Sequence, residues 1–401
     1  MDQILVNLEK FKIFNHEKVR IDSRICEFHY RLTTLLLFTC TSIISFTQVF
    51  GSPINCVQSG SSTKPHPVPE DIMNTFCFTQ TTFTYINQDE SPLTYPGITS
   101  EGDPDDIRYH SYYQWVPIFL FIQALVFLTP HFLWKCKEGS LMTNLLKTNE
   151  HYLIMTTAAR KLQFKQVSSY LIKRHGSFYV YAYAYLLNIL FNTLAVCFNI
   201  YSMEMLLRGY FKYLGAQFID YMWTRRNATH LTNPLDITFP KMTKCTFYKY
   251  GPSGTLEVVD AMCLLPLNNL NEKIFIMLWF WYLILFCISI SYSVMKISQG
   301  LAINSRNTLL MKRYFFTSGF ILDEELKILL EKLDVGQWFV IDIVRLNLSS
   351  LHYKDFLKAL VEGFRDKRRL QNNNNVILAE TGCMGNGQVD HDHVESHEPH
   401  M

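Results

Sequence analysis

Four stretches of this chain are long, apolar and free of charged side chains, and no other feature of the sequence constrains the fold as strongly. A helix needs about 20 apolar residues to cross about 30 Å of hydrocarbon. None of the four stretches contains Asp, Glu, Lys or Arg, and the first begins too late and is too long to be the apolar part of a cleaved signal peptide. We therefore predict four transmembrane helices, at residues 32–50, 115–134, 178–203 and 274–295.

The composition supports a membrane protein with sizeable aqueous parts. Hydrophobic residues make up 48% of the chain and charged residues 18%, which is too apolar for an ordinary soluble protein and too polar for one wholly inside the bilayer. The net charge of +2 gives no support for nucleic-acid binding. The sequence has no Gly-rich phosphate loop, no His-Glu-x-x-His motif, no Cys-x-x-Cys motif and no carboxylate pair in a span. We therefore expect no enzyme activity, no catalytic residue and no cofactor.

The distribution of basic residues predicts the orientation in the membrane. Lys and Arg number six before the first span, eight between the second and third, and thirteen after the fourth, whereas the loop at 51–114 has two against eight acids. Because basic residues collect on the cytosolic side, both termini and the loop at 135–177 are expected in the cytosol. The loop at 204–273 has eight basic residues as well, but loops of this length translocate largely regardless of charge. Residues 51–114 and 204–273 are therefore the predicted extracellular loops.

The cytosolic parts are predicted to be helical up to a disordered tail. Apolar residues recur at helical spacing near the start of the N-terminal segment, residues 1–31, and again at 322–333 and 351–364. The last two helices lie within residues 296–370, which we expect to form a helical dome, whereas the polar residues 371–401 are typical of a disordered tail.

Four histidines crowd the end of this tail and raise the question of a metal site. Imidazole is a common metal ligand. Few apolar residues surround the histidines to fix a geometry, and His-rich disordered tails are frequent, so we expect no metal site. The histidines are His391, His393, His397 and His400.

The predicted topology sorts the ten cysteines of the chain. Two lie in each extracellular loop, where the oxidising environment favours disulfides. An even number of cysteines there predicts two disulfides, and four cysteines allow three connectivities. The two bonds either close each loop separately or join one loop to the other, and spacing alone leaves this open. The four cysteines are Cys56, Cys77, Cys245 and Cys263.

Polar side chains are rare within the predicted spans. Asn188, Asn192 and Asn199 lie in the third span and predict a face that packs on neighbouring helices through hydrogen bonds. His131 and Glu204 lie near the ends of spans, where we expect them to be at the membrane interface.

Several segments together resemble the innexin family. At the start of the second predicted span the chain reads Tyr-Tyr-Gln-Trp-Val, residues Tyr112, Tyr113, Gln114, Trp115 and Val116, which is similar to the signature motif of innexins. Cysteine-containing segments of both extracellular loops and the approach to the fourth span are also similar to innexins. The resemblance covers about residues 20–365. These further segments are residues 51–56, 239–247, 250–255, 264–268 and 271–274.

The resemblance implies a fold and a function. Innexins are all-α membrane proteins with four transmembrane helices, a disulfide-bonded extracellular domain and a helical cytoplasmic dome, and they assemble as octameric rings. Such a ring forms a large-pore channel in the plasma membrane and docks with a ring of the adjoining cell at a gap junction. The resemblance also implies disulfides between Cys56 and Cys263 and between Cys77 and Cys245. The expected partners are other innexin subunits, identical or different, the docked ring and membrane lipid.

In innexins the N-terminal segment folds into the pore as a funnel, although an amphipathic helix of this kind can also lie on the membrane surface. By this resemblance Met1, Asp2, Gln3 and Asn7 are the candidates for the narrowest place. The first extracellular loop adds a negative field, which predicts a mild cation preference if its acids face the pore and none if they form a solvated rim. These acids are Glu70, Asp71, Asp89, Glu90, Glu101, Asp103, Asp105 and Asp106.

Two other functions compete with the docked channel. An undocked hemichannel would release small molecules from single cells, as the related pannexins do, and a glycan at the sequon Asn227-Ala228-Thr229 could favour it by obstructing docking. A four-span adhesion protein would use the loops only to bind. The chain lacks the Cys-Cys-Gly sequence that a tetraspanin needs, and claudins need a Trp-Cys pattern of their own in the first loop.

Overall fold

The computed structural model describes residues 19–58, 68–85, 95, 97–98, 106–146, 157–224, 233–301 and 333–383. The chain forms two compact units. The described residues of 21–139 and 183–298 make one of them, which we call the bundle unit. The described residues of 140–182 and 299–383, together with residues 19–20, belong to the other, the helical unit.

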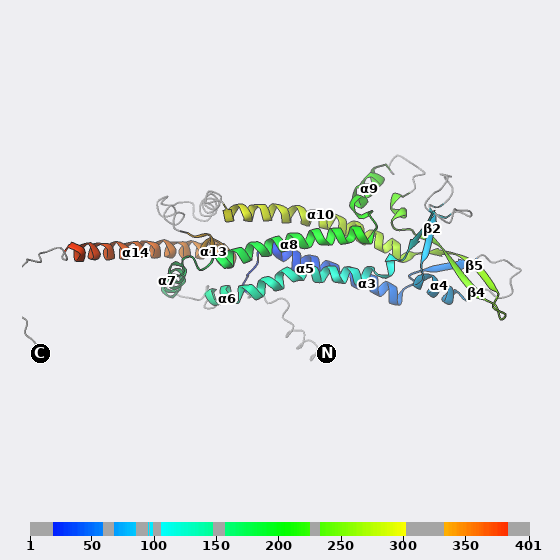
Figure 1. Cartoon of the computed structure of the whole chain (residues 1–401), viewed down its shortest axis with the longest axis horizontal. Helices are drawn as coiled ribbons and strands as arrows, with labels where there is room; N and C mark the ends of the chain where they lie inside the picture. The colour runs from blue at the N-terminus through cyan, green and yellow to red at the C-terminus, as the bar shows by residue number, and fades with distance from the viewer. Residues whose placement is uncertain are drawn as a thin grey trace, which may run out of the picture. The chain divides into compact units, whose positions relative to one another are not determined.

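Four long apolar helices lie at the positions of the predicted spans. Each is long and apolar enough to cross a membrane, and each covers one of the predicted apolar stretches, apart from the first residue of two of them, Trp115 and Phe178. Only Pro266–Leu301 extends beyond its stretch at both ends, whereas Arg24–Phe50 begins earlier and Val116–Glu138 and Tyr179–Leu206 end later than theirs. Such extensions are allowed because only the part inside hydrocarbon must be free of charge. Figure 1 shows the four helices running alongside one another. They are the first span, made of α2 (Arg24–Glu27), η1 (Phe28–Thr33) and α3 (Thr34–Phe50), followed by α5 (Val116–Glu138), α8 (Tyr179–Leu206) and α10 (Pro266–Leu301).

Apolar side chains fill the interior of this bundle. Leu37 on α3, Leu120 and Phe127 on α5, and Leu278 on α10 have no exposed surface. Large apolar side chains on the outer faces are exposed instead, for example Phe46 at 65%. A helix that is apolar all round is typical of a membrane environment.

A five-stranded antiparallel sheet lies at the end of the bundle where α3 ends and α10 begins (Figure 1). The all-α expectation did not include this sheet. Its strands are short except for two, and alternate residues of β4 such as Thr243 and Cys245 are buried, the period of a strand with one covered face. The order is β1 (Asn55–Gln58), β5 (Leu256–Leu264), β4 (Met242–Tyr250), β2 (Thr82–Tyr85) and β3 (Ile107–His110).

Short helices complete this end of the bundle unit. We call the sheet and these helices the disulfide-bonded region. Its helical elements are α4 (Glu70–Thr79), η3 (Tyr112–Gln114), α9 (Phe211–Thr224) and η5 (Pro234–Ile237).

The helical unit has a small apolar core of its own. Phe164, Trp338, Phe339 and Phe356 are buried in it, and Asp334 and Gln337 form a capping box at the start of α13. The elements are α6 (Leu141–Leu146), α7 (Thr157–Lys173), α13 (Val335–Asn347) and α14 (Ser350–Cys383).

Two predictions for the cytosolic parts can be compared with this unit. The predicted helix at 351–364 lies within α14, whereas the one at 322–333 falls almost wholly outside the described residues. Residues 371–383, which we had assigned to the disordered tail, continue α14 as a helix. Extending a packed helix costs less than starting one, so a polar segment that would not form a helix alone can prolong α14.

Candidate functional site

Two disulfides join the first predicted loop to the second. Cys56 on β1 bonds Cys263 on β5, where the two residues lie opposite each other in the ladder, and Cys77 on α4 bonds Cys245 on β4. These are the pairs that the family resemblance implied, and neither loop is closed on itself by them. The bonds span 207 and 168 residues of sequence, so they connect parts of the chain that the spans separate.

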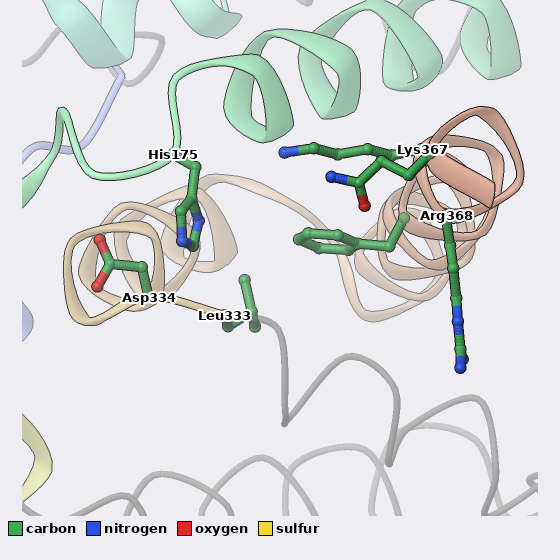
Figure 2. Close-up of a pocket in the computed structure, with 7 residues that line it drawn as sticks. His175, Leu333, Asp334, Lys367 and Arg368 are labelled. Carbon is green, nitrogen blue, oxygen red and sulfur yellow. The ribbon is translucent and has the colours of Figure 1, made fainter. Parts of the chain in front are cut away.

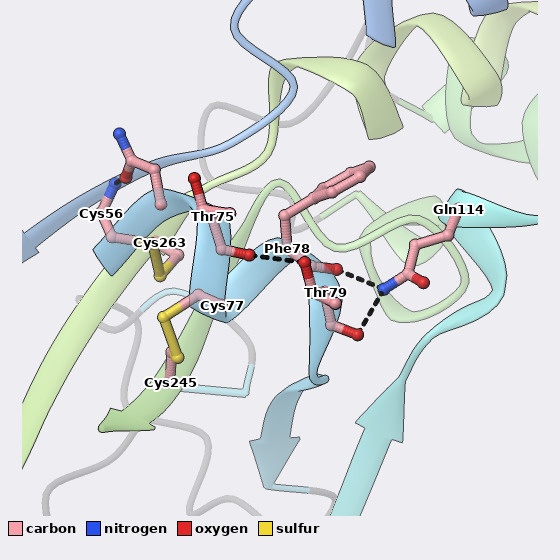
Figure 3. The surroundings of a disulfide bond; sticks show 9 residues. Cys56, Thr75, Cys77, Phe78, Thr79, Gln114, Cys245 and Cys263 are labelled. Atoms are coloured by element: carbon pink, nitrogen blue, oxygen red, sulfur yellow. Dashed lines mark hydrogen bonds between the residues drawn. A yellow bond between two sulfur atoms is a disulfide. The ribbon is translucent and has the colours of Figure 1, made fainter. Parts of the chain in front are cut away.

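The two disulfides lie next to each other. Figure 3 shows both beside α4, and the sulfur atoms of Cys56, Cys77 and Cys263 are within 4.8 Å of one another. Such a cluster can resemble a metal site, but a sulfur in a disulfide is no thiolate and does not offer the usual cysteine ligand. The cluster therefore acts as a covalent fastening of α4, β1, β4 and β5.

The first tyrosine of the Tyr-Tyr-Gln-Trp-Val motif fastens the start of α5 to the second loop and to α10. The Tyr112 hydroxyl lies 3.1 Å from the Thr238 carbonyl oxygen and 3.2 Å from Oδ1 of Asn268. Asn268 in turn donates from Nδ2 to the Pro240 carbonyl at 3.0 Å. Burial raises the pKa of Tyr112, which keeps the hydroxyl protonated and able to donate.

The next residues of the motif fasten the same turn to α4. Gln114 donates from Nε2 to the carbonyls of Phe78 and Thr79 at the end of α4 (Figure 3). Tyr113 is fully buried and its ring lies 5.5 Å from that of Phe78.

The last two residues of the motif have opposite environments. Trp115 is 60% exposed, whereas Val116 is buried as the first residue of α5. An exposed tryptophan at the end of an apolar helix suits the membrane interface.

A partly buried ionic group lies beside these contacts. The Lys241 ammonium is 2.9 Å from Asp236 and 3.2 Å from Glu272, which is 1% exposed at the start of α10. Burial alone would lower the pKa of Lys241, but its bonds to the two carboxylates outweigh this and raise it. Burial raises the pKa of Asp236 against the opposite effect of Lys241. The backbone N–H of Lys241 also donates to the Tyr95 hydroxyl at 2.9 Å.

Sequence reasoning did not assign a role to this group. The only signal was the position of Asp236, Lys241 and Glu272 in or next to segments that resemble innexins. Their pairing depends on how the second loop folds back on α10, which the order of residues does not state.

Several side-chain hydrogen bonds connect the helices of the bundle. The Tyr282 hydroxyl donates to Oε1 of Gln123 at 2.9 Å, and Gln123 donates to the Asn199 carbonyl at 3.1 Å, linking α10, α5 and α8. Thr193 and Ser293 join α8 to α10 at 2.7 Å.

The three asparagines predicted to bond neighbouring helices are all buried. Their side-chain amides bond within α8 itself, Asn192 to the Asn188 carbonyl and Asn199 to the Ala195 carbonyl. The bonds that cross between helices are instead made by other side chains and by the Asn199 carbonyl.

The two residues predicted at the interface have defined partners in the structure. His131 Nδ1 lies 2.7 Å from Asp22 Oδ2, and its ring stacks on Tyr30 at 3.8 Å. Glu204 accepts from the Lys212 backbone N–H at 2.6 Å. The partners of both residues, Asp22 and Lys212, belong to the bundle unit, as His131 and Glu204 do.

Many of the predicted site residues lie outside the described part of the chain. This holds for the four pore candidates Met1, Asp2, Gln3 and Asn7, for the sequon at Asn227, for the four tail histidines and for most acids of the first loop. Of the described acids, Glu70 and Asp71 are exposed in the first turn of α4, where negative charge stabilises a helix.

The helical unit contains a cavity of about 380 Å³ (Figure 2). Basic side chains on its rim belong to α14, which is exposed there, and Asp334 on the opposite side caps α13. We find no arrangement in it that indicates chemistry. It is lined by His175, Leu333, Asp334, Phe364, Lys367, Arg368 and Gln371.

Comparison with known proteins connects this geometry to one family. Residues 22–364 match the family model described as Innexin. The chain is 33% identical over 349 residues to Innexin shaking-B of Drosophila melanogaster, covering 85% of this chain and 90% of that protein. It is 30% identical over 356 residues to Innexin inx2 of Schistocerca americana, covering 88% of this chain and 95% of that protein.

Proposed function

Because this chain belongs to the innexin family of gap junction channel proteins, we propose that it forms large-pore channels that pass ions and small molecules between adjoining cells. It is a channel protein rather than an enzyme. One observation carries the proposal above all: the family match spans residues 22–364, and so includes all four apolar helices as well as the disulfide-bonded region.

The packing of the bundle supports a pore between subunits rather than within one. Side chains such as Leu37, Phe127 and Leu278 fill the space among the four helices and have no exposed surface. A hydrated path wide enough for small molecules does not fit there, so the pore lies on the axis of a ring. The family resemblance suggests eight subunits, of this chain alone or mixed with other innexins.

The proposed orientation puts the disulfide-bonded region outside the cell and both termini inside. Disulfides persist in oxidising surroundings, which agrees with this side of the membrane. In this arrangement the disulfide-bonded regions of two rings meet at a gap junction. The N-terminal residues Met1, Asp2, Gln3 and Asn7 line the narrowest part of the pore, and acids of the first loop give a mild cation preference.

Two sequons offer a test of this orientation. Asn227 lies in the second loop and Asn347 ends α13 in the helical unit, so only Asn227 meets the glycosylation machinery. Glycosidase treatment of the wild-type protein and of Asn227→Gln and Asn347→Gln variants measures this as a shift in electrophoretic mobility. A shift that disappears with Asn347→Gln would reverse the orientation.

Dye transfer tests the channel itself. Paired cells that express the chain should pass a small fluorescent dye to each other, and single cells should take up little. Dye uptake into single cells without transfer would favour the hemichannel, which nothing in the structure or the comparisons favours over the junction. Neither uptake nor transfer, with the protein at the surface, would contradict a channel and favour adhesion.

A variant without one disulfide tests whether dye transfer depends on the disulfide-bonded region. The double variant Cys56→Ser and Cys263→Ser alters the region that would meet the second ring, and Cys136→Ser is the matched control because Cys136 is a free, exposed cysteine. We expect loss of dye transfer only in the double variant.

A further inference from the structure

The first span contains a turn that is wound differently from the rest of the helix. Three hydroxyls in α3 donate to the carbonyl four residues earlier: Thr39 to Leu35, Ser42 to Phe38 and Thr47 to Ile43. Thr33 donates to the carbonyl of Phe28, five residues earlier, at 2.9 Å. It lies at the end of a π-helical turn, η1 (Phe28–Thr33), which holds one more residue than an α-helical path would.

Two contacts from α10 hold this turn. The indole N–H of Trp281 donates to Oγ1 of Thr33 at 3.0 Å, so the same hydroxyl bonds both the turn and α10. His29 Nε2 lies 2.9 Å from Oγ of Ser289, and both residues are buried.

The direction of the second bond follows from counting protons. The Ser289 hydroxyl donates its one hydrogen to the Leu285 carbonyl at 2.5 Å. The imidazole must therefore donate from Nε2 to Ser289, which fixes the tautomer of His29. A residue that replaces His29 must therefore offer an N–H to Oγ of Ser289 to keep this hydrogen bond.

Both sides of the turn are attached to α5. Before it, the Trp134 indole donates to the Ile21 carbonyl at 3.2 Å and His131 bonds Asp22 at 2.7 Å. After it, α3 packs along α5 with Leu37 and Ile44 buried. The extra residue in η1 lets both segments keep these positions.

Relaxation of the turn would change the segment before it. A residue in an α-helix turns by about 100° and rises about 1.5 Å. If η1 became α-helical, residues 21–27 would rotate by about this amount relative to α3. Cys26, which is 2% exposed, would turn out of the core.

We propose that His29 and Thr33 are positioning residues of the channel: by holding the π-turn they fix the rotation of residues 21–27, and thereby the direction in which the N-terminal segment leaves the first span. This rests on the proposed function, in which that segment lines the pore. Because Ser289 and Trp281 belong to α10, the fourth span also helps to hold the π-turn.

Cysteine labelling tests the register without any need for channel activity. The native thiols serve as reporters: Cys26 is buried before the turn, Cys40 is buried after it, and Cys136 is exposed. A maleimide is applied to membranes and the modified residues are identified by mass spectrometry. In the wild-type protein only Cys136 of these three should react.

Two variants should release the turn. His29→Leu removes the bond to Ser289, and deletion of Leu32, an exposed residue of η1, brings Thr33 to the four-residue spacing of the other hydroxyls. We expect Cys26 to react at a rate comparable with that of Cys136 while Cys40 stays protected. His29→Gln, which keeps an N–H at the required place, and Leu32→Ala should leave Cys26 protected.

Conductance then tests the effect on the pore. The unitary conductance of junctions between paired cells should fall in His29→Leu and recover in His29→Gln, at equal surface amounts measured by biotinylation. Protection of Cys26 in both releasing variants, or labelling of Cys40 together with Cys26, would overturn the proposal. If labelling follows the expectation but wild-type junctions do not conduct, the proposed function fails and the register of the first span stands.

Discussion

The disulfide-bonded region and the four-helix bundle are held together in different ways. In the disulfide-bonded region, covalent bonds, the Tyr112 hydroxyl and the ion pair of Lys241 with Glu272 connect separate segments of the chain. In the bundle, each helix satisfies its own backbone, and apolar packing joins the helices with a few hydrogen bonds such as that of Tyr282 to Gln123. The disulfide-bonded region depends mainly on particular pairs of residues, whereas the bundle depends mainly on apolar packing, with particular pairs such as His29 and Ser289 at the π-turn.

This difference predicts where single substitutions should lower the stability of the protein most. Loss of a buried methyl group from the bundle costs about 0.5–1.5 kcal/mol. Loss of one partner of a buried hydrogen bond in the disulfide-bonded region leaves the other partner unsatisfied, which costs about 1–3 kcal/mol. Four variants, the first with two substitutions, test the particular contacts of the disulfide-bonded region, from the largest expected effect to the smallest.

Removing the Cys56–Cys263 disulfide should have the largest effect. Loss of a native disulfide from a small domain typically costs about 2–5 kcal/mol, and here the bond joins β1 to β5. The double variant Cys56→Ser and Cys263→Ser should become sensitive to protease in the disulfide-bonded region while far-UV circular dichroism shows that the bundle helices persist. Equal loss of helix and of protease resistance would show that the two regions do not differ in this way.

Adding a methyl group at Gly215 should rank second. A Cβ there would lie 2.1 Å from a ring atom of Trp279, and the Trp279 indole is held by its bond to the Lys212 carbonyl. Overpacking of this kind costs about 1–3 kcal/mol, so Gly215→Ala should lower the thermal unfolding temperature. The exposed neighbour Ala216 provides the control, since Ala216→Ser should be nearly neutral. No shift in Gly215→Ala would mean that α9 moves freely on α10.

Acid should destabilise the disulfide-bonded region through His110. Burial, with a smaller effect of Arg108 and Arg208, lowers the pKa of His110 from 6.5 to about 3. In the unfolded chain His110 therefore binds a proton below about pH 6.5, whereas in the folded chain it stays neutral down to about pH 3. Stability should fall across this window by up to about 1.4 kcal/mol per pH unit.

His110→Gln isolates this contribution. The amide can still bond the Thr84 hydroxyl, which lies 2.8 Å from the imidazole Nε2, but it does not titrate. Unfolding measured by urea titration between pH 7 and pH 4 should be less pH-dependent in the variant. Parallel curves for the two proteins would contradict the assignment.

Tyr112→Phe should have the smallest of the four effects. It removes one hydroxyl that bonds Thr238 or Asn268, and a buried hydrogen bond contributes about 0.5–1.5 kcal/mol. The matched control is Tyr213→Phe, because Tyr213 is 55% exposed. An effect of Tyr112→Phe no larger than the control, in thermal unfolding, would show that the motif works by packing alone.

The sequence by itself determined the four spans. An apolar run without charges must be a helix in hydrocarbon, because only a helix bonds all its own backbone groups there. The same reasoning did not find the ends of α10 or the helical continuation of α14 into residues 371–383, since outside the membrane the length of a helix depends on what it packs against.

In the disulfide-bonded region, the family resemblance predicted more of the structure than the local sequence pattern did. Four cysteines in two loops left three pairings, and only the resemblance implied the pairs found in the structure. The sheet was not foreseen. The pair β4–β5 is a hairpin within the second loop, which the sequence reasoning missed, whereas the pairing of β1 with β5 and of β2 with β4 depends on segments from both loops meeting.

What only the tertiary structure decided is which distant groups meet. The ion pair of Lys241 with Glu272, the hydrogen bond of Tyr112 to Asn268 and the bonds of Ser289 and Trp281 to the π-turn all join residues that no spacing rule connects. Local sequence sets the backbone conformation that each segment prefers, whereas these contacts arise from how the helices and loops pack. The spans could therefore be found in the sequence one at a time, and the groups that fasten them together could not.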